Sequence, residues 1–143
     1  MNEAADRLNA ILARIPYARF LGLQAELAGD EMTVILPFSQ HLVGNVQLPA
    51  IHGGVLGALL EITALAQLSL TQGLARQPRP IDVTVEYLRS GRPLDTYARA
   101  TIKRLGRRVA NVQVEAWQEE RARPIASLHG HFHVTPSDGG AAT

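Results

Sequence analysis

A single carboxylate lies inside an otherwise apolar run of the chain. The 16 residues from Val55 to Leu70 read VLGALLEITALAQLSL, and Glu61 is the one ionisable side chain among them. Burying an unpaired carboxylate is costly unless it finds partners or takes up a proton. Glu61 could therefore lie at a helix edge or pair with an arginine. Alternatively, it is a general base or nucleophile, because carboxylates in perturbed surroundings gather in active sites.

The residues just before this run favour a site for a developing negative charge. His52, Gly53 and Gly54 stand where the helix should begin. Glycines let a ligand approach the backbone closely, and the free N–H groups of a first helical turn bind anions. The alternative is a plain glycine-rich helix entry. His52 is a candidate general base, although a structural hydrogen bond that shapes the turn suits its position better.

Glu61 and the two glycines cannot act on one substrate from a single helix. Glu61 follows Gly53 by eight residues, which is ~12 Å along the axis at 1.5 Å per residue. A glutamate side chain does not span that distance. If both act on one substrate, Glu61 comes from a second chain whose helix runs antiparallel, and a two-fold dimer makes two equivalent sites. The small residues Gly57 and Ala58 would let something approach this helix closely.

The remaining pattern predicts one helix against a sheet. Residues 3–14 carry apolar side chains at helical spacing, and the apolar helix should cover 54–71. Two short strands are expected before it, with a loop over 37–51. After it, strict apolar–polar alternation is typical of antiparallel strands with one buried face. The six expected strands lie at 23–28, 32–36, 81–87, 98–103, 110–116 and 126–134.

A helix that is apolar all round must be covered all round. We therefore predict an α+β fold, in which a curved antiparallel sheet surrounds one long central helix and a short helix lies at the N-terminus. Residues 1–135 should form a single domain, and residues 136–143 (PSDGGAAT) should be a disordered tail.

Composition excludes several classes of function. The net charge is +1 and 5% of residues are aromatic, which does not suit a nucleic-acid partner. There is no cysteine, so thiolate chemistry and disulfides are excluded. The N-terminal stretch lacks the apolar core of a secretory signal, and the run at 55–70 reads as too short and too polar to span a membrane. We expect no membrane partner and a cytoplasmic location.

Five segments in this order resemble the hotdog-fold acyl-CoA thioesterases, the nearest branch being the phenylacetate-pathway and 4-hydroxybenzoyl-CoA type. The resemblance covers roughly residues 16 to 134 and implies the hotdog fold. It also implies hydrolysis of an acyl-CoA to the free acid and CoA, in a dimer or tetramer. No cofactor is implied beyond the CoA that the substrate carries. The segments are LG at 21–22, IHGGVLGALLE, IDVTVEYLRSGRP, RLGRRVANVQVEAWQ and PIASLHGHFHV.

The resemblance also implies roles for particular residues. The backbone N–H of Gly53 or Gly54 would polarise the thioester carbonyl, and Glu61 would attack it or activate water. The Asn or Gln upstream of the motif falls on Asn45 or Gln47. One departure occurs at Leu65, where some members of the 4-hydroxybenzoyl type carry a hydroxyl residue one turn after the acid. This departure predicts a more apolar acyl pocket.

Cations should rim the cleft, because CoA carries a pyrophosphate and a 3′-phosphate. The candidates at places that match the family are Arg89 with Ser90, and Arg107 with Arg108. Taken singly, each arginine could be a solvated turn charge.

The residues His129, His131 and His133 share one face of a strand, where an i, i+2 pair can bind a metal. No further partner is obviously placed to complete such a site, so we predict no metal.

Two other functions remain open. A 3-hydroxyacyl thioester dehydratase or hydratase shares the implied fold and uses a histidine with a helix glutamate. The histidines nearest before Glu61, His41 and His52, lack the sequence context of those enzymes. The other alternative is a hotdog protein that binds acyl-CoA without catalysis.

Overall fold

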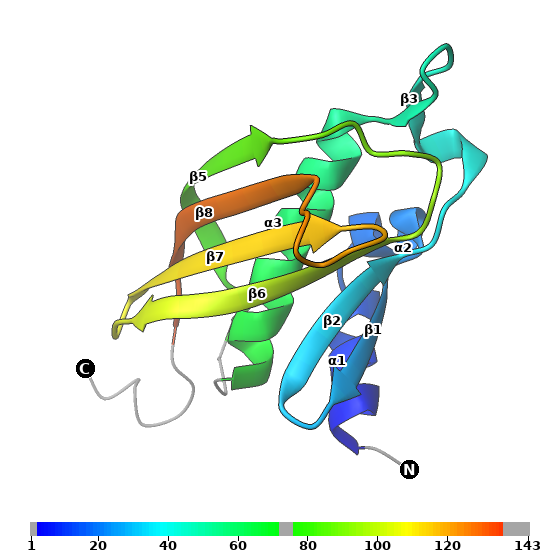
Figure 1. Ribbon diagram of the computed structural model, residues 1–143. Helices are drawn as coiled ribbons and strands as arrows, with labels where there is room; N and C mark the ends of the chain where they lie inside the picture. Colours follow the sequence, from blue (N-terminus) through cyan, green and yellow to red (C-terminus); the bar gives the residue numbers. More distant parts are fainter. Residues whose placement is uncertain (1–2, 72–75, 136–143) are drawn as a thin grey trace.

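A long helix lies against a six-stranded antiparallel sheet (Figure 1). The computed structural model describes residues 3–71 and 76–135, so the predicted tail at 136–143 lies outside the described residues. The helices are α1 (Glu3–Ala13), α2 (Pro16–Leu21), the 3₁₀ turn η1 (Gln40–Leu42) and α3 (Gly53–Thr71). The strands are β1 (Gln24–Ala28), β2 (Glu31–Leu36), β3 (Val43–Asn45), β4 (Ala50–Ile51), β5 (Arg79–Tyr87), β6 (Thr96–Leu105), β7 (Val109–Trp117) and β8 (Ala126–His133).

The sheet has the strand order β1-β2-β6-β7-β8-β5, and β3 pairs with β4 in a separate hairpin. Alternate residues of the central strands are buried, as the period-two pattern predicts. On β7, for example, Val112 and Val114 are buried and pair with Gly130 and Leu128 of β8. The buried faces of these strands form the wall on which α3 packs, with most contacts to β6 and β7.

Strand β5 departs from the expectation of one buried face. It is one of the two edge strands of the sheet, the other being β1, and pairs on one side only, with β8. Val83 and Tyr87, which share the inner face with Val85, are 38% and 56% exposed. The alternation correctly predicted a strand, but a single chain does not cover that strand, because nothing described in the chain lies beyond this edge.

Helix α3 has 19 residues, and most of those between Val55 and Leu68 are buried, with Gly57, Ala58, Glu61 and Gln67 only partly buried. By length and composition alone it could cross a membrane, so the expectation that this run is too short and too polar for a span is wrong on both points. The core helix of a globular domain passes the same test. In this chain α3 packs against five strands (β2, β5, β6, β7 and β8), which is the position of a core helix.

Three local elements were not predicted from the sequence: α2, the 3₁₀ turn η1 and the β3–β4 hairpin. Helix α2 has Pro16 in its first turn, and the chain leaves it through Gly22 in the left-handed region at φ 77°. Residues 43–51 form the β3–β4 hairpin instead of a plain loop. Gly44 packs so closely on His52 that an added Cβ would lie 2.7 Å from the His52 Cα. The hairpin is thereby fixed against the start of α3.

Candidate active site

Of the two backbone amides that could stabilise an oxyanion, the Gly54 N–H is already hydrogen-bonded to the His52 side chain. The Gly54 N–H donates a hydrogen bond of 2.8 Å to Nδ1 of His52, which precedes the first residue of α3. The ring nitrogen that accepts this bond carries no proton, so the proton of a neutral ring lies on Nε2. His52 therefore caps the helix in the way that Ser or Asn commonly does. Of the two glycines, Gly53 is left as the available donor.

Gly53 presents a free amide beside a cavity. Its N–H has no hydrogen-bond partner among the described residues. Its carbonyl accepts a 2.9 Å hydrogen bond from the Tyr87 hydroxyl. Gly53, Leu56 and Tyr87 line a cavity of about 360 Å³, together with the loop at 88–91. An unpaired amide at the positive end of a 19-residue helix can stabilise an oxyanion.

Glu61 is half-buried on the least covered face of α3. Gly57 and Ala58, which share this face at helical spacing, are also only partly buried. Within the described part of the chain, the Glu61 carboxylate forms no hydrogen bond or ion pair. The interpretation that it pairs with an arginine therefore finds no support within one chain. Thr63 differs, since it is buried and donates to the Leu59 carbonyl at 2.7 Å.

Asn45 and Gln47 lie in the β3–β4 hairpin, and both are exposed. The Asn45 Oδ1 accepts hydrogen bonds from the backbone N–H groups of Gln47 and Leu48, at 3.0 and 3.2 Å. This is an Asx turn, so the side-chain oxygen shapes the loop. Neither residue lines the cavity beside Gly53. A contact of either with substrate stays a prediction.

The predicted phosphate-binding residues fall into two groups at opposite ends of the sheet. Arg89 and Ser90 line the cavity beside Gly53 and also an adjoining hollow of about 220 Å³. Arg107 and Arg108 line a separate cavity of about 530 Å³. The strand register separates them, because Tyr87 pairs with one end of β8 and Arg79 with the other. Eight residues of strand span about 26 Å, so one chain does not bring both groups to one ligand.

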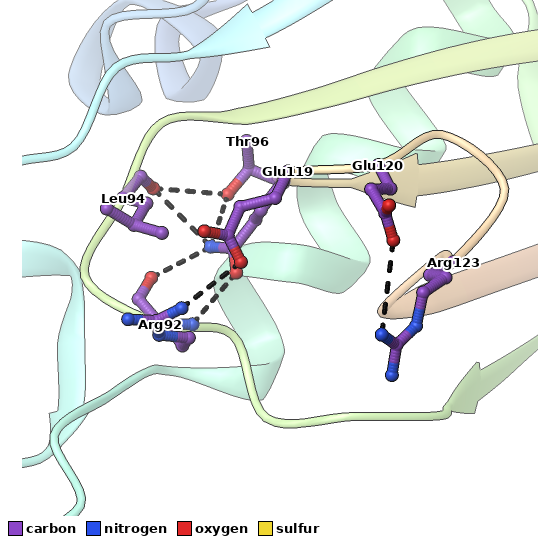
Figure 2. A network of polar contacts seen from close by, with 7 residues as sticks. Arg92, Leu94, Thr96, Glu119, Glu120 and Arg123 are labelled. Carbon is purple, nitrogen blue, oxygen red and sulfur yellow. Dashed lines mark hydrogen bonds and ion pairs between the residues drawn. The ribbon is translucent and has the colours of Figure 1, made fainter.

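Two loops beside Arg89 are tied together by a polar network that the sequence did not reveal (Figure 2). Gln118 Nε2 donates to the Arg92 carbonyl and to Thr96 Oγ1, at 2.8 and 3.1 Å, while Arg92 N–H donates to Gln118 Oε1 at 3.0 Å. The side chains of Arg92 and Arg123 form ion pairs with Glu119 and Glu120. Arg89, by contrast, has no side-chain partner in the described ranges.

The three histidines of β8 lie outside this site. Asp82 on β5 accepts a 3.0 Å hydrogen bond from Nδ1 of His131, and this bond lowers the pKa of the Asp82 carboxyl, with a smaller electrostatic contribution from His129. The pair is exposed to solvent. Among residues 3–71 and 76–135, no three His, Asp or Glu side chains are grouped to hold a metal ion.

Tyr87 is the residue of this site whose role the sequence reasoning missed. It lies within the quoted segment IDVTVEYLRSGRP, but no role was assigned to it. The alternation of β5 contained the signal, because Tyr87 has the same parity as Val83 and Val85 and so faces the helix. The start of α3 and the end of β5 thus meet at one point.

A long central helix packed against a six-stranded antiparallel sheet, with a short N-terminal helix, is the architecture of the hotdog class, and comparisons with known proteins agree. Residues 44–136 match the family model described as the acyl-CoA thioesterase N-terminal domain. The medium/long-chain acyl-CoA thioesterase YigI of Escherichia coli is 30% identical over 135 residues, covering 84% of this chain and 86% of YigI.

Two solved structures share the fold. A protein from Chromobacterium violaceum is 31% identical with a TM-score of 0.74, covering 96% of this chain and 100% of that one. The thioesterase HI1161 from Haemophilus influenzae is 23% identical with a TM-score of 0.81, covering 95% of this chain and 93% of that one.

The chain belongs to the acyl-CoA thioesterase family and has the hotdog fold. It is an enzyme that hydrolyses acyl-CoA thioesters. The resemblance stated from the sequence is thereby confirmed, and hydrolysis is favoured over the dehydratase and the non-catalytic alternatives.

Proposed function

We propose that two copies of the chain share each active site, with the Gly53 N–H of one copy holding the oxyanion and Glu61 of the other acting as base or nucleophile. The observation that carries this proposal is that α3 has two polar groups without a partner in the part of the chain that the structure describes. The Gly53 amide and the Glu61 carboxylate both lack partners in the described chain, yet they lie eight residues apart on one helix. An antiparallel second helix brings each beside its complement.

The uncovered edge of the sheet supports such a dimer. Strand β5 offers unpaired backbone groups and the exposed side chains of Ile81 and Val83. An exposed strand edge of this kind is a template for pairing with another chain. The face of α3 that carries Gly57, Ala58 and Glu61 is incompletely covered. Pairing two β5 strands about a two-fold axis covers both features at once.

The chemistry follows from these two groups. As a general base, Glu61 takes a proton from water while the water oxygen bonds to the carbonyl carbon. The Gly53 N–H stabilises the resulting oxyanion. The C–S bond then breaks, and the CoA thiolate leaves and takes up the proton from Glu61. As a nucleophile, the carboxylate instead forms an acyl anhydride as the thiolate leaves, and water then hydrolyses the anhydride.

For the acyl group we propose a medium or long aliphatic chain. Leu65 follows Glu61 by one helical turn and is buried, so this part of α3 offers no hydroxyl to a polar acyl group. Ile51 and Leu56 add apolar walls to the cavity beside Gly53. YigI, which is described as a medium/long-chain acyl-CoA thioesterase, supports the same substrate class.

Arg89 is the proposed contact for a CoA phosphate. Arg89 lines the cavity that contains Gly53, and its side chain has no carboxylate partner among the described residues, whereas Arg92 is paired with Glu119. Arg107 and Arg108 could reach the same ligand only from the partner subunit, because the antiparallel arrangement places the far end of one sheet beside the near end of the other.

The test is hydrolysis of decanoyl-CoA, with the released thiol detected, by Glu61→Gln and Glu61→Ala. We expect kcat to fall by about 10²-fold or more in both, the range for a positioned base. The thermal midpoint and the molecular mass should stay unchanged. Glu115→Gln, which alters a carboxylate on β7, is the control. Unchanged turnover in the Glu61 variants would contradict the proposal.

A further inference from the structure

The peptide group that joins Gly53 and Gly54 is fixed at both of its polar atoms. Its N–H donates to His52 Nδ1 at 2.8 Å, and its carbonyl accepts from the Tyr87 hydroxyl at 2.9 Å. These two side chains come from opposite directions. His52 precedes α3, whereas Tyr87 ends β5, 34 residues further along the chain.

The Tyr87 ring also packs directly on the glycines. A Cβ added at Gly53 would lie 3.4 Å from Tyr87 Cε1, and one added at Gly57 would lie 3.4 Å from the Tyr87 hydroxyl oxygen. The ring therefore covers the first turn of α3 on the side where side chains are missing. Tyr87 also lines the cavity that contains Gly53.

From these contacts we infer that Tyr87 is a positioning residue for the thioesterase reaction, and this inference rests on the proposed role of the Gly53 amide. The peptide that carries the Gly53 N–H is held at the His52 carbonyl, which accepts from the N–H groups of Val55 and Leu56. The next peptide lies between two glycines, which have more backbone freedom than any other residue, so its orientation depends on the contacts with His52 and Tyr87. Fixing the next peptide at both ends restricts the torsions of Gly53 and Gly54. The Gly53 N–H then meets the developing charge already oriented, without a reorganisation cost during the reaction.

Tyr87→Phe removes the hydroxyl while leaving the ring on the glycines. We expect kcat to fall about tenfold, which is part of the 10²–10³-fold loss seen when an oxyanion donor is removed outright. KM for decanoyl-CoA should change by less than about twofold, because the carbonyl contact strengthens only in the transition state. Tyr97→Phe on β6 is the matched control, since Tyr97 stacks on Trp117 away from the site.

A spectroscopic measurement separates orientation from general damage. In the Glu61→Gln background, decanoyl-CoA labelled with ¹³C at its carbonyl can be bound and its infrared band recorded. We expect this band to lie below its position in solution, because the Gly53 N–H polarises the carbonyl. Adding Tyr87→Phe should move the band back toward the solution value, whereas adding Tyr97→Phe should leave it in place. Matched thermal midpoints establish that the variants remain folded.

The outcomes distinguish the inference from the function on which it rests. A carbonyl band unshifted in Glu61→Gln itself would overturn the oxyanion role of Gly53. A shifted band that Tyr87→Phe leaves unchanged, or a kcat equal to that of the native enzyme, would overturn the inference about Tyr87 alone. A rise in KM with unchanged kcat would also overturn it, because Tyr87 would then contribute only to substrate binding.

Discussion

The first two amides of α3 differ in what they can do, although both belong to glycine. The Gly54 N–H is occupied by His52, and only the Gly53 N–H remains available. His52 therefore serves the site by occupying a neighbouring donor. His52 thus makes a structural contact, although a histidine here would equally suit a general base. The available amide belongs to Gly53, which lines the same cavity as Tyr87 and Arg89.

Because His52 caps α3, substitutions at this position should lower the free energy of unfolding by different amounts. His52→Ala removes the acceptor for the Gly54 N–H, so we expect the free energy of unfolding to fall by about 1 kcal/mol, the usual cost of losing an N-cap. His52→Asn supplies a shorter acceptor that suits the same position, and it should restore most of that loss. Urea denaturation measures both. Equal stability of His52→Ala and the native chain would show that the 2.8 Å contact does not stabilise α3.

Strand β5 contributes to the site in two ways. Its end carries Tyr87, and its edge, which is unpaired in the described part of the chain, is available to a partner strand. Its position depends on Gly130 of β8, which lies opposite Val83 beside an irregularity in the β5 register. A side chain at Gly130 would meet the Asp82 carbonyl oxygen and would lie 2.8 Å from Val83 Cγ1. The glycine therefore allows the edge strand to approach β8 closely.

Gly130→Ala should push β5 away from β8. Because the contact is with backbone, we expect destabilisation of about 1–3 kcal/mol, as in other overpacked sites. Dimer dissociation at low concentration should also increase, since the displaced strand forms the proposed interface. Urea denaturation and analytical ultracentrifugation measure the two effects. Gln113→Ala, at an exposed outward position on the neighbouring strand β7, is the control, because the Gln113 side chain forms no contact with β5 among the described residues. An unchanged urea midpoint in Gly130→Ala would refute this account of β5.

Sequence periodicity correctly predicted where α1, α3 and the six strands of the main sheet lie, but it did not predict that the inner face of β5 is exposed in a single chain. The apolar run predicted α3, and strict alternation predicted the four strands after it, because both patterns report which face is buried. The contacts at the site could not be predicted in the same way. Tyr87 meets Gly53 across 34 residues, and Gln118 meets Arg92 across 26. Such pairings depend on the register of the strands and on the loop conformations, which no local pattern records.

If each active site of the dimer takes residues from both chains, two inactive variants should restore one active site when they are combined in a heterodimer. A site within one chain would not show this effect. Glu61→Gln removes the carboxylate and leaves the amide. Gly53→Pro removes the amide hydrogen, and proline is tolerated in the first helical turn, where Gly53 stands. Each homodimer should be nearly inactive. Light scattering after gel filtration should show that both variants still form dimers.

A heterodimer of these two variants, purified through two different affinity tags, has one site with the native Gly53 and the native Glu61, contributed by different chains. Its other site lacks both groups. We therefore expect about half of the native activity per dimer, well above either parent. If the amide and the carboxylate of a site came from the same chain, each site of the heterodimer would retain one defect, and the activity would stay at the level of the parents. That result would refute the shared site, because a site built from a single chain regains no missing group when two different variants form a dimer.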